Sequence, residues 1–490
     1  MKRLVISLVV VVAFVSCSGS APASAGQPKA PAEIPITSKS PEAIELFKKG
    51  RDLSDNLRTA EAVEVLDRAL KLDPDFALAL AYRGVGVPGP EGVKNLEEAN
   101  VKAAAASKPE QLLIAALLSG AQADFTRSQE QWKQLTDAVP DDWRAHMNRG
   151  AQLFVLQKYD AALDSLNKAT DLNPDAGPAY NMIGYAHLTQ GEADRAVEVL
   201  RKYAALAPNE PNPQDSLGEA LMANGQFADA EAAFQKAISL SPDFGVAWEG
   251  VAYTKFFRGD WAGGQAAVAK AREVAARGPE RLTAARLGAY GKLAQGQTAE
   301  GLKAIDALVK SPDATPVDVA FASVDRAGVL AENGRYRDAI AEAAKAVRAA
   351  DSGQLPLGAA LNLRNVALAV TAEAQGRMGD AAGAKETVAS LQKQADGRPE
   401  DPFAKTTLHF AQGMLAAAQK DMNAARTHFA MCIESDFACH WHAFEVSRAA
   451  GDKTGADIFL ARLTKQYRRN PLYVYAGASV TREGIPRTRN

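Results

Sequence analysis

The sequence is short of three things: cysteine, aromatic side chains and an excess of charge of either sign. Three cysteines in 490 residues cannot build the dense disulfide framework of a small secreted scaffold. The 56 basic and 58 acidic side chains leave a formal net charge of −2, so nothing in the composition points to a nucleic acid as partner. Aromatic residues make up 7% of the chain and apolar residues 47%. Much of the apolar share is alanine, which favours many closely packed helices over β-sandwiches or barrels.

The motifs that hold a phosphate, a catalytic nucleophile or a catalytic metal are also missing. The sequence has no His-Glu-x-x-His, no Gly-x-Ser-x-Gly and no Walker-type loop. Gly84, Gly86 and Gly89 spell Gly-x-Gly-x-x-Gly, but the segment contains Pro88 and follows a helical pattern, so it indicates a loop. We therefore expect a protein that is not an enzyme and that carries no cofactor or metal.

The longest apolar segment opens the chain. Two basic residues precede the largely apolar segment Leu4–Val15, and small residues follow it. Its twelve residues are too few for a permanent transmembrane helix, which needs about 20. A basic start, a short apolar stretch and a small-residue zone are the three parts of a secretory signal peptide. We therefore expect residues 1–16 to be removed and the mature chain to lie outside the cytoplasm.

The end of this segment suggests a lipid anchor. Phe14-Val15-Ser16-Cys17 resembles the lipobox of bacterial lipoproteins. The resemblance implies lipid attachment at Cys17, and Ser18 after it implies the outer membrane, with the protein facing the periplasm. Cleavage after Ala25 is the alternative, which would give a soluble periplasmic or secreted protein. Residues 17–40 are rich in Ala, Pro, Ser and Gly and are predicted to form a disordered tether.

The body of the chain repeats. Prolines recur every 34 residues, at positions 140, 174, 208 and 242. Gly191, Gly225 and Gly259 recur at the same interval, each between two segments with helical periodicity, where a glycine ends a helix. Each unit is therefore predicted to be a helix, a turn, a second helix and another turn. Repeats of this length indicate a solenoid.

Small residues recur at matching places on the two predicted helices of each unit. Packed helices approach to about 8–10 Å, and small side chains permit the closest approach. The recurring positions are Gly150, Ala162 and Pro174, then Gly184, Ala196 and Pro208, then Gly218, Ala230, Phe234 and Pro242. This pattern resembles the tetratricopeptide repeat (TPR), which implies an all-α, right-handed superhelical solenoid of antiparallel helix pairs.

Following the pattern outward predicts about 12 helix pairs between residues 42 and 470. We expect N-terminal pairs over 41–142, the regular array over 143–280 and degenerate pairs over 281–470. The segment 471–490 has no helical period after Tyr475 and is predicted to be a frayed tail; a basic contact segment is the alternative.

The resemblance also implies which side chains face the concave groove of the solenoid. They are polar, acidic and aromatic: Asn181, Tyr185, Asp215, Glu219, Glu249, Tyr253 and Phe256. Repeats that capture a carboxyl terminus carry Lys, Arg and Asn at such positions, and the three acidic residues here would repel that group. The groove should favour a segment with Lys or Arg and apolar side chains; a solvated helix face is the alternative.

One segment near the C-terminus concentrates reactive side chains. Cys432, Cys439, His440 and His442 lie within eleven residues. Three interpretations remain open: a disulfide across a helix–helix turn, a metal site built from thiolates and imidazoles, and unpaired cysteines that pack in the core. The 34-residue repeat nonetheless dominates the chain.

We therefore predict a non-enzymatic scaffold or adaptor of the bacterial cell envelope. It would bind protein or peptide partners of the envelope along its concave groove and would be attached to the membrane through Cys17. The alternative is a redox or metal-handling protein that works through the segment Cys432–His442.

Overall fold

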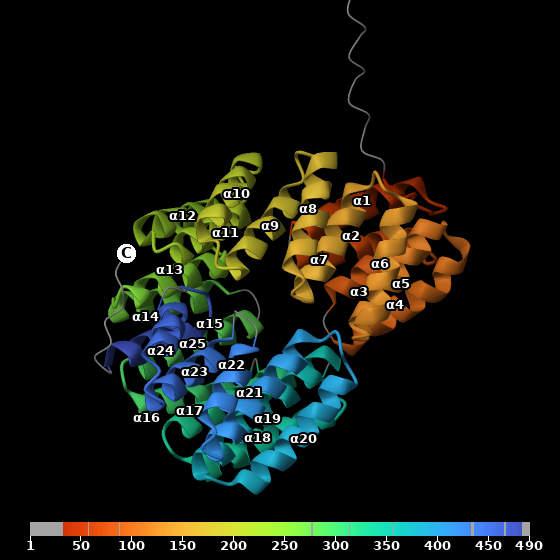
Figure 1. Ribbon diagram of the computed structural model, residues 1–490. Coiled ribbons are helices and arrows are strands. Elements are labelled where there is room, and N and C mark those ends of the chain that lie inside the picture. The colour runs from red at the N-terminus through yellow and green to blue at the C-terminus, as the bar shows by residue number, and fades with distance from the viewer. Residues whose placement is uncertain are drawn as a thin grey trace, which may run out of the picture.

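The computed structural model describes residues 33–56, 58–87, 89–275, 278–312, 314–355, 357–432, 436–464 and 467–482. Within these ranges the chain forms 25 α-helices, one short 3₁₀ helix and no strand (Figure 1). The prediction of an all-α solenoid is confirmed. No helix in the described ranges combines the length and the apolarity needed to cross a bilayer.

Consecutive helices pack against each other as pairs from α1 to α24, which gives the predicted twelve pairs. The N-terminal helices are α1 (Pro41–Asp55), α2 (Thr59–Leu72), α3 (Ala77–Gly86), α4 (Pro90–Lys102), α5 (Lys108–Ala121) and α6 (Phe125–Ala138). The central helices are α7 (Trp143–Val155), α8 (Tyr159–Leu172), α9 (Gly177–Thr189), α10 (Ala193–Leu206), α11 (Pro211–Ala223), α12 (Phe227–Leu240), α13 (Gly245–Phe257) and α14 (Trp261–Val274).

The second half of the chain continues the same arrangement and adds one unpaired helix. Its helices are α15 (Gly278–Ala294), α16 (Thr298–Val309), α17 (Pro316–Glu332), α18 (Tyr336–Asp351), α19 (Leu357–Met378), α20 (Ala381–Asp396), α21 (Pro402–Ala418), α22 (Met422–Ala430), α23 (Phe437–Ala449), α24 (Lys453–Thr464) and α25 (Pro471–Arg482).

Glycine has two separate uses in each repeat. Gly191, Gly225 and Gly259 end α9, α11 and α13 with φ of 79°, 76° and 81°, a left-handed conformation that costs glycine little. Gly218 instead lets two helices meet, because a Cβ there would lie 2.6 Å from the ring of Phe234 on α12. The ring of Phe234 fills the space beside Gly218 and is fully buried. The glycine and the aromatic residue of the repeat pattern thus pack the two helices together.

Residues 33–40 are ordered, which corrects the prediction that the tether extends to residue 40. The backbone N–H of Ile34 donates to Asp142 at 2.5 Å, and that of Thr37 donates to Glu110 at 2.8 Å. These carboxylates belong to the N-terminal repeats, so the segment is held along them. The signal peptide, Cys17 and the remainder of the predicted tether, up to residue 32, lie outside the described residues.

The C-terminal end also differs from the prediction of a frayed tail. Residues 471–482 form α25, which packs against α13 and α15 in the middle of the chain (Figure 1). Tyr473, Val474 and Ala478 of α25 belong to the same hydrophobic cluster as the central repeats. The end of the solenoid therefore folds back onto its centre. Residues 483–490 lie outside the described residues.

Candidate functional site

The groove of the central repeats is occupied by a segment of the same chain. We call residues 467–482 the C-terminal arm: the non-helical stretch 467–470 followed by α25. Two nitrogens of Arg469 donate to the two carboxylate oxygens of Asp215, at 2.6 and 3.0 Å. The guanidinium also lies 3.5 Å from Glu219 and 4.7 Å from the ring centre of Phe234. Asp215 therefore recognises the arginine by charge and paired hydrogen bonds, Glu219 adds a second negative charge, and Phe234 adds a cation–π contact.

The two residues before Arg469 extend this contact. Arg468 donates to the carbonyl oxygens of Leu188 and Thr189, at 3.2 and 3.1 Å, at the end of α9. The last carbonyls of a helix lack partners within it and carry partial negative charge, so they suit a guanidinium. Tyr467 packs edge-on against Phe227 and Phe257, with ring centres 4.9 and 5.3 Å away.

Burial shapes the electrostatics of this groove. Burial raises the pKa of Glu219, and the charge of Arg469 opposes that rise. Burial likewise raises the pKa of Glu249 to about 7, again against the pull of Arg469. Tyr185 donates its hydroxyl hydrogen to Glu219 at 3.0 Å, which orients the carboxylate toward the arm. Burial thus disfavours the ionised form of these two carboxyl groups, and the charge of Arg469 favours it.

Of the remaining residues predicted to face the groove, Phe256 lies elsewhere. Asn181 is buried, and its side-chain oxygen accepts no hydrogen bond from the described residues. Tyr253 is buried and stacks on Phe257 at 6.2 Å. Phe256 was predicted to face the groove, and this is wrong: it is 1% exposed and lies in the helix core beside Trp261. The alternative of a solvated face is also wrong for Asp215, which is 3% exposed.

A cavity of about 940 Å³ lies beside the arm, between the central repeats and the C-terminal half. A volume of this size is typical of sites that bind a small molecule or several residues of a peptide. Its lining is rich in aromatic side chains, among them Tyr185, Tyr290, Phe321, Phe410, Phe437, Trp441, Tyr467 and Tyr473. Arg468 and Arg469 line it as well, so the groove and this inner cavity are continuous.

Two clusters of charged side chains lie in the wall of the inner cavity. In the first, Arg286 on α15 forms an ion pair with Asp325 on α17, with one contact at 2.6 Å. Tyr290 donates its hydroxyl hydrogen to the same carboxylate at 3.0 Å. Arg286 and Tyr290 thus both hydrogen-bond to the Asp325 carboxylate, and these contacts link α15 to α17.

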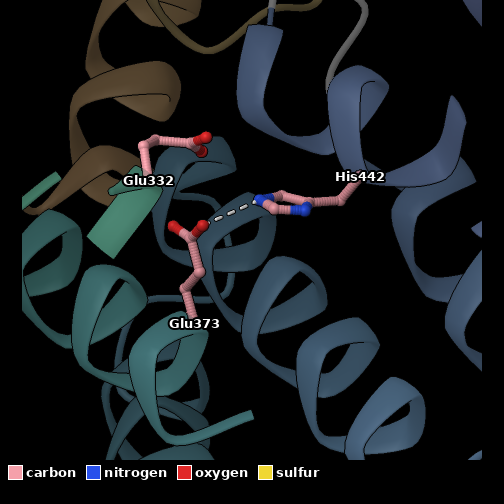
Figure 2. Close-up of side chains that lie close together, drawn as sticks. All are labelled: Glu332, Glu373 and His442. Carbon is pink, nitrogen blue, oxygen red and sulfur yellow. Dashed lines mark ion pairs between the residues drawn. The ribbon is translucent and has the colours of Figure 1, made fainter. Parts of the chain in front are cut away.

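The second cluster brings Glu332, Glu373 and His442 together from α17, α19 and α23 (Figure 2). His442 Nε2 lies 3.2 Å from Glu373, and Nδ1 lies 2.9 Å from Glu445. Burial alone would lower the pKa of His442, but Glu373 and Glu445 outweigh it and raise this pKa to about 10. The partial burial of Glu332 raises its pKa to about 7, and the charge of Glu373 adds to the rise.

The cysteines lie close to this second cluster in the chain. In the structure Cys432 and Cys439 form a disulfide with Cα atoms 6.3 Å apart, which joins the end of α22 to α23. Of the three interpretations of this segment, the disulfide is the one seen in the structure. Its sulfurs are not thiolates, so a metal site built from them is not formed; His440 is buried in α23.

Comparisons with known proteins agree with the fold. One tetratricopeptide repeat family model matches residues 47–85, 115–176, 152–211 and 286–354, and a second matches 214–244. These residues are tetratricopeptide repeats, including a stretch of the predicted degenerate region. No curated protein matches the sequence.

Solved structures similar to this chain include three of low sequence identity. MamA from Desulfovibrio magneticus is 20% identical, with a TM-score of 0.30, over 34% of this chain and 93% of its own. A tetratricopeptide repeat protein from Parabacteroides merdae is 16% identical, with a TM-score of 0.36, over 57% and 96%. YrrB, described as having an unusual peptide-binding site, is 18% identical, with a TM-score of 0.25, over 42% and 89%.

Proposed function

We propose that this protein is a non-enzymatic scaffold whose concave groove binds segments of other proteins that carry arginine or lysine next to aromatic residues. One observation carries the proposal: the groove already holds such a segment, Tyr467-Arg468-Arg469. A partner with the same chemistry would find the same acidic, carbonyl and aromatic contacts. Recognition of an extended peptide by a helical-repeat groove needs no catalytic group.

The proposal includes a place in the cell. An export signal and a lipid on Cys17 would tether the repeats to the outer membrane, facing the periplasm, where envelope proteins or their segments are the partners. The support is the N-terminal sequence. Metabolic labelling with a radioactive fatty acid tests this: the full chain should take up label and fractionate with the outer membrane. A Cys17→Ser variant should do neither, and label uptake by that variant would contradict the lipid anchor.

Binding is tested with a labelled peptide of residues 467–475 added to the full chain in trans. The wild-type groove is occupied, so the peptide should bind weakly. Arg469→Ala should loosen the arm and raise the affinity of the groove for the peptide about tenfold or more, because a charged hydrogen-bonded pair contributes about 1.5–3 kcal/mol. Adding Asp215→Asn to Arg469→Ala should abolish the gain.

The matched control is Arg195→Ala, which also removes one arginine from an ion pair but on the exposed surface, where Arg195 meets Glu192. This control should bind the peptide as weakly as the wild type. Equal affinity of all four proteins for the peptide would contradict the assignment of the groove.

A further inference from the structure

The cluster of Glu332, Glu373 and His442 has no part in holding the arm. One ligand-capable atom from each side chain lies within 4.8 Å of the other two. The three side chains point toward one another from three different helices (Figure 2), and all three line the inner cavity. A carboxylate, a second carboxylate and an imidazole nitrogen are donors that divalent transition-metal ions accept.

The spacing of the two buried donors suits a small tetrahedral ion. Bonds of about 2.0–2.1 Å from zinc to oxygen and nitrogen place neighbouring ligand atoms about 3.3–3.4 Å apart. His442 Nε2 and Glu373 Oε1 lie 3.2 Å apart, and their side chains are 5% and 8% exposed. The Glu332 side chain is 30% exposed and can turn toward them without breaking the core.

A second layer of contacts fixes the imidazole. Glu445 lies 2.9 Å from Nδ1 of His442, so it can accept the N–H that leaves Nε2 free for a metal. A carboxylate behind a metal-binding histidine is a recurrent feature of metal sites. Arg377 donates to Glu445 at 3.1 Å and so holds that carboxylate beside Nδ1; its own 3.3 Å contact with Nδ1 is not a hydrogen bond when Nδ1 carries the proton.

The charges of the cluster leave room for a dication. Glu332, Glu373 and Glu445 bring three negative charges, and Arg377, which lies 3.1 Å from Glu373 and 4.0 Å from Glu332, brings one positive charge. Without a metal, Glu373 and Glu445 keep His442 protonated, so the ion must displace this proton from Nε2. With the neutral imidazole that results and with Glu332 ionised, the sum is −3 + 1 = −2. One divalent ion neutralises this group of side chains.

We propose that Glu332, Glu373 and His442 form a binding site for one divalent transition-metal ion, with Zn²⁺ as the fitting ion. Its fourth ligand position would face the inner cavity, because all three side chains lie in the cavity wall. The site uses no cysteine, which separates it from a thiolate centre. The metal-site proposal depends on other residues than the groove proposal does, so either proposal can fail while the other holds.

The experiment uses the full chain, without a polyhistidine tag and with its disulfide intact, after treatment with a chelator and removal of that chelator. Titration with Zn²⁺ against a fluorescent competitor should show one tight equivalent. Glu332→Gln, Glu373→Gln and His442→Gln should each weaken Zn²⁺ binding about 100-fold, and Glu445→Gln about tenfold. Co²⁺ bound in place of Zn²⁺ should give a visible spectrum without a thiolate charge-transfer band.

His187→Gln is the matched control, because His187 also pairs with a glutamate, Glu192 at 2.7 Å, but lies outside the cluster. It should leave Zn²⁺ affinity unchanged. The proposal is overturned if the wild type takes up no stoichiometric Zn²⁺, if a thiolate band appears, or if the Glu332→Gln protein binds as tightly as the wild type. Glu332 is the most exposed of the three ligands, so its variant decides the question even if the buried variants fail to fold.

Discussion

Arg469 forms a two-pronged ion pair with Asp215, a residue 254 positions earlier in the chain. Their side chains are 12% and 4% exposed, so both charges are withdrawn from water and depend on each other. This pair holds the end of the solenoid against its middle. The arm thus closes the superhelix and fills the groove that would otherwise receive a partner.

Removing the arginine should open this closure. Arg469→Ala leaves Asp215 buried without its partner, which costs about 3–5 kcal/mol for a buried ion pair. Hydrogen exchange should speed up in α25 and in the helices that it contacts, α13 and α15. Arg469→Lys keeps the charge but loses the paired hydrogen bonds. Hydrogen exchange of α25 in this variant should therefore be faster than in the wild type and slower than in Arg469→Ala. Unchanged protection of α25 in Arg469→Ala would contradict the closing role of the pair.

Truncating Phe234 should have a local effect and also release the arm. Phe234→Ala removes a fully buried ring and should cost about 3–5 kcal/mol. It also removes the ring that lies 4.7 Å from the Arg469 guanidinium. Leu200→Ala is the control, because Leu200 fills the corresponding place against Gly184 one repeat earlier.

Both variants should raise hydrogen exchange in their own and adjacent repeats, since solenoid stability is set by neighbours. Only Phe234→Ala should also raise exchange in α25. Equal exchange of α25 in the two variants would show that Phe234 does not support the arm.

The sequence was sufficient to predict the packing of helices within one repeat. The 34-residue register identified Gly218 as a small residue where two helices approach, and a Cβ there would indeed meet Phe234 on the second helix of the same pair. Phe256 was misplaced because Gly264 and Gly291 on the next two helices leave a space that its ring fills. No single-repeat pattern contains that information.

Long-range pairs were beyond the repeat pattern. The position of Arg469 relative to Asp215 depends on the angles between all the repeats that separate them. A small error in each predicted angle would add up and move residue 469 away from Asp215. One signal was available: the groove was predicted to favour a basic and apolar segment, and Tyr467-Arg468-Arg469 of the same chain fits that description. Of the cluster around His442, the sequence singled out His442 alone, because Glu332 and Glu373 come from two other helices with no common spacing.

The stability of the closed form should depend on pH through Glu249. Its pKa is raised to about 7 by burial, above its ordinary value of about 4.5, so the folded state binds this proton more tightly than the unfolded state does. The resulting stabilisation is complete below pH 4.5 and is lost as the pH rises through 7.

Glu249→Gln cannot ionise and should escape this loss. The variant should therefore gain stability relative to the wild type between pH 5 and pH 8, on the order of 1–3 kcal/mol. Urea unfolding at the two pH values, followed by hydrogen exchange of α13, measures the difference. A difference between the two proteins that does not change with pH would contradict the shifted pKa.

The disulfide between Cys432 and Cys439 should stabilise the C-terminal repeats specifically. Mass spectrometry with and without reductant should first show the bonded pair in protein from an oxidising compartment. The two cysteines are seven residues apart, and closing so short a loop restricts the unfolded chain by about 2 kcal/mol. Reduction, or the Cys439→Ser change, should therefore raise hydrogen exchange in α22 and α23 while leaving α1 to α6 unchanged. A uniform loss of protection along the chain would contradict this, because the bond constrains one turn and neighbouring repeats pass on only part of the change.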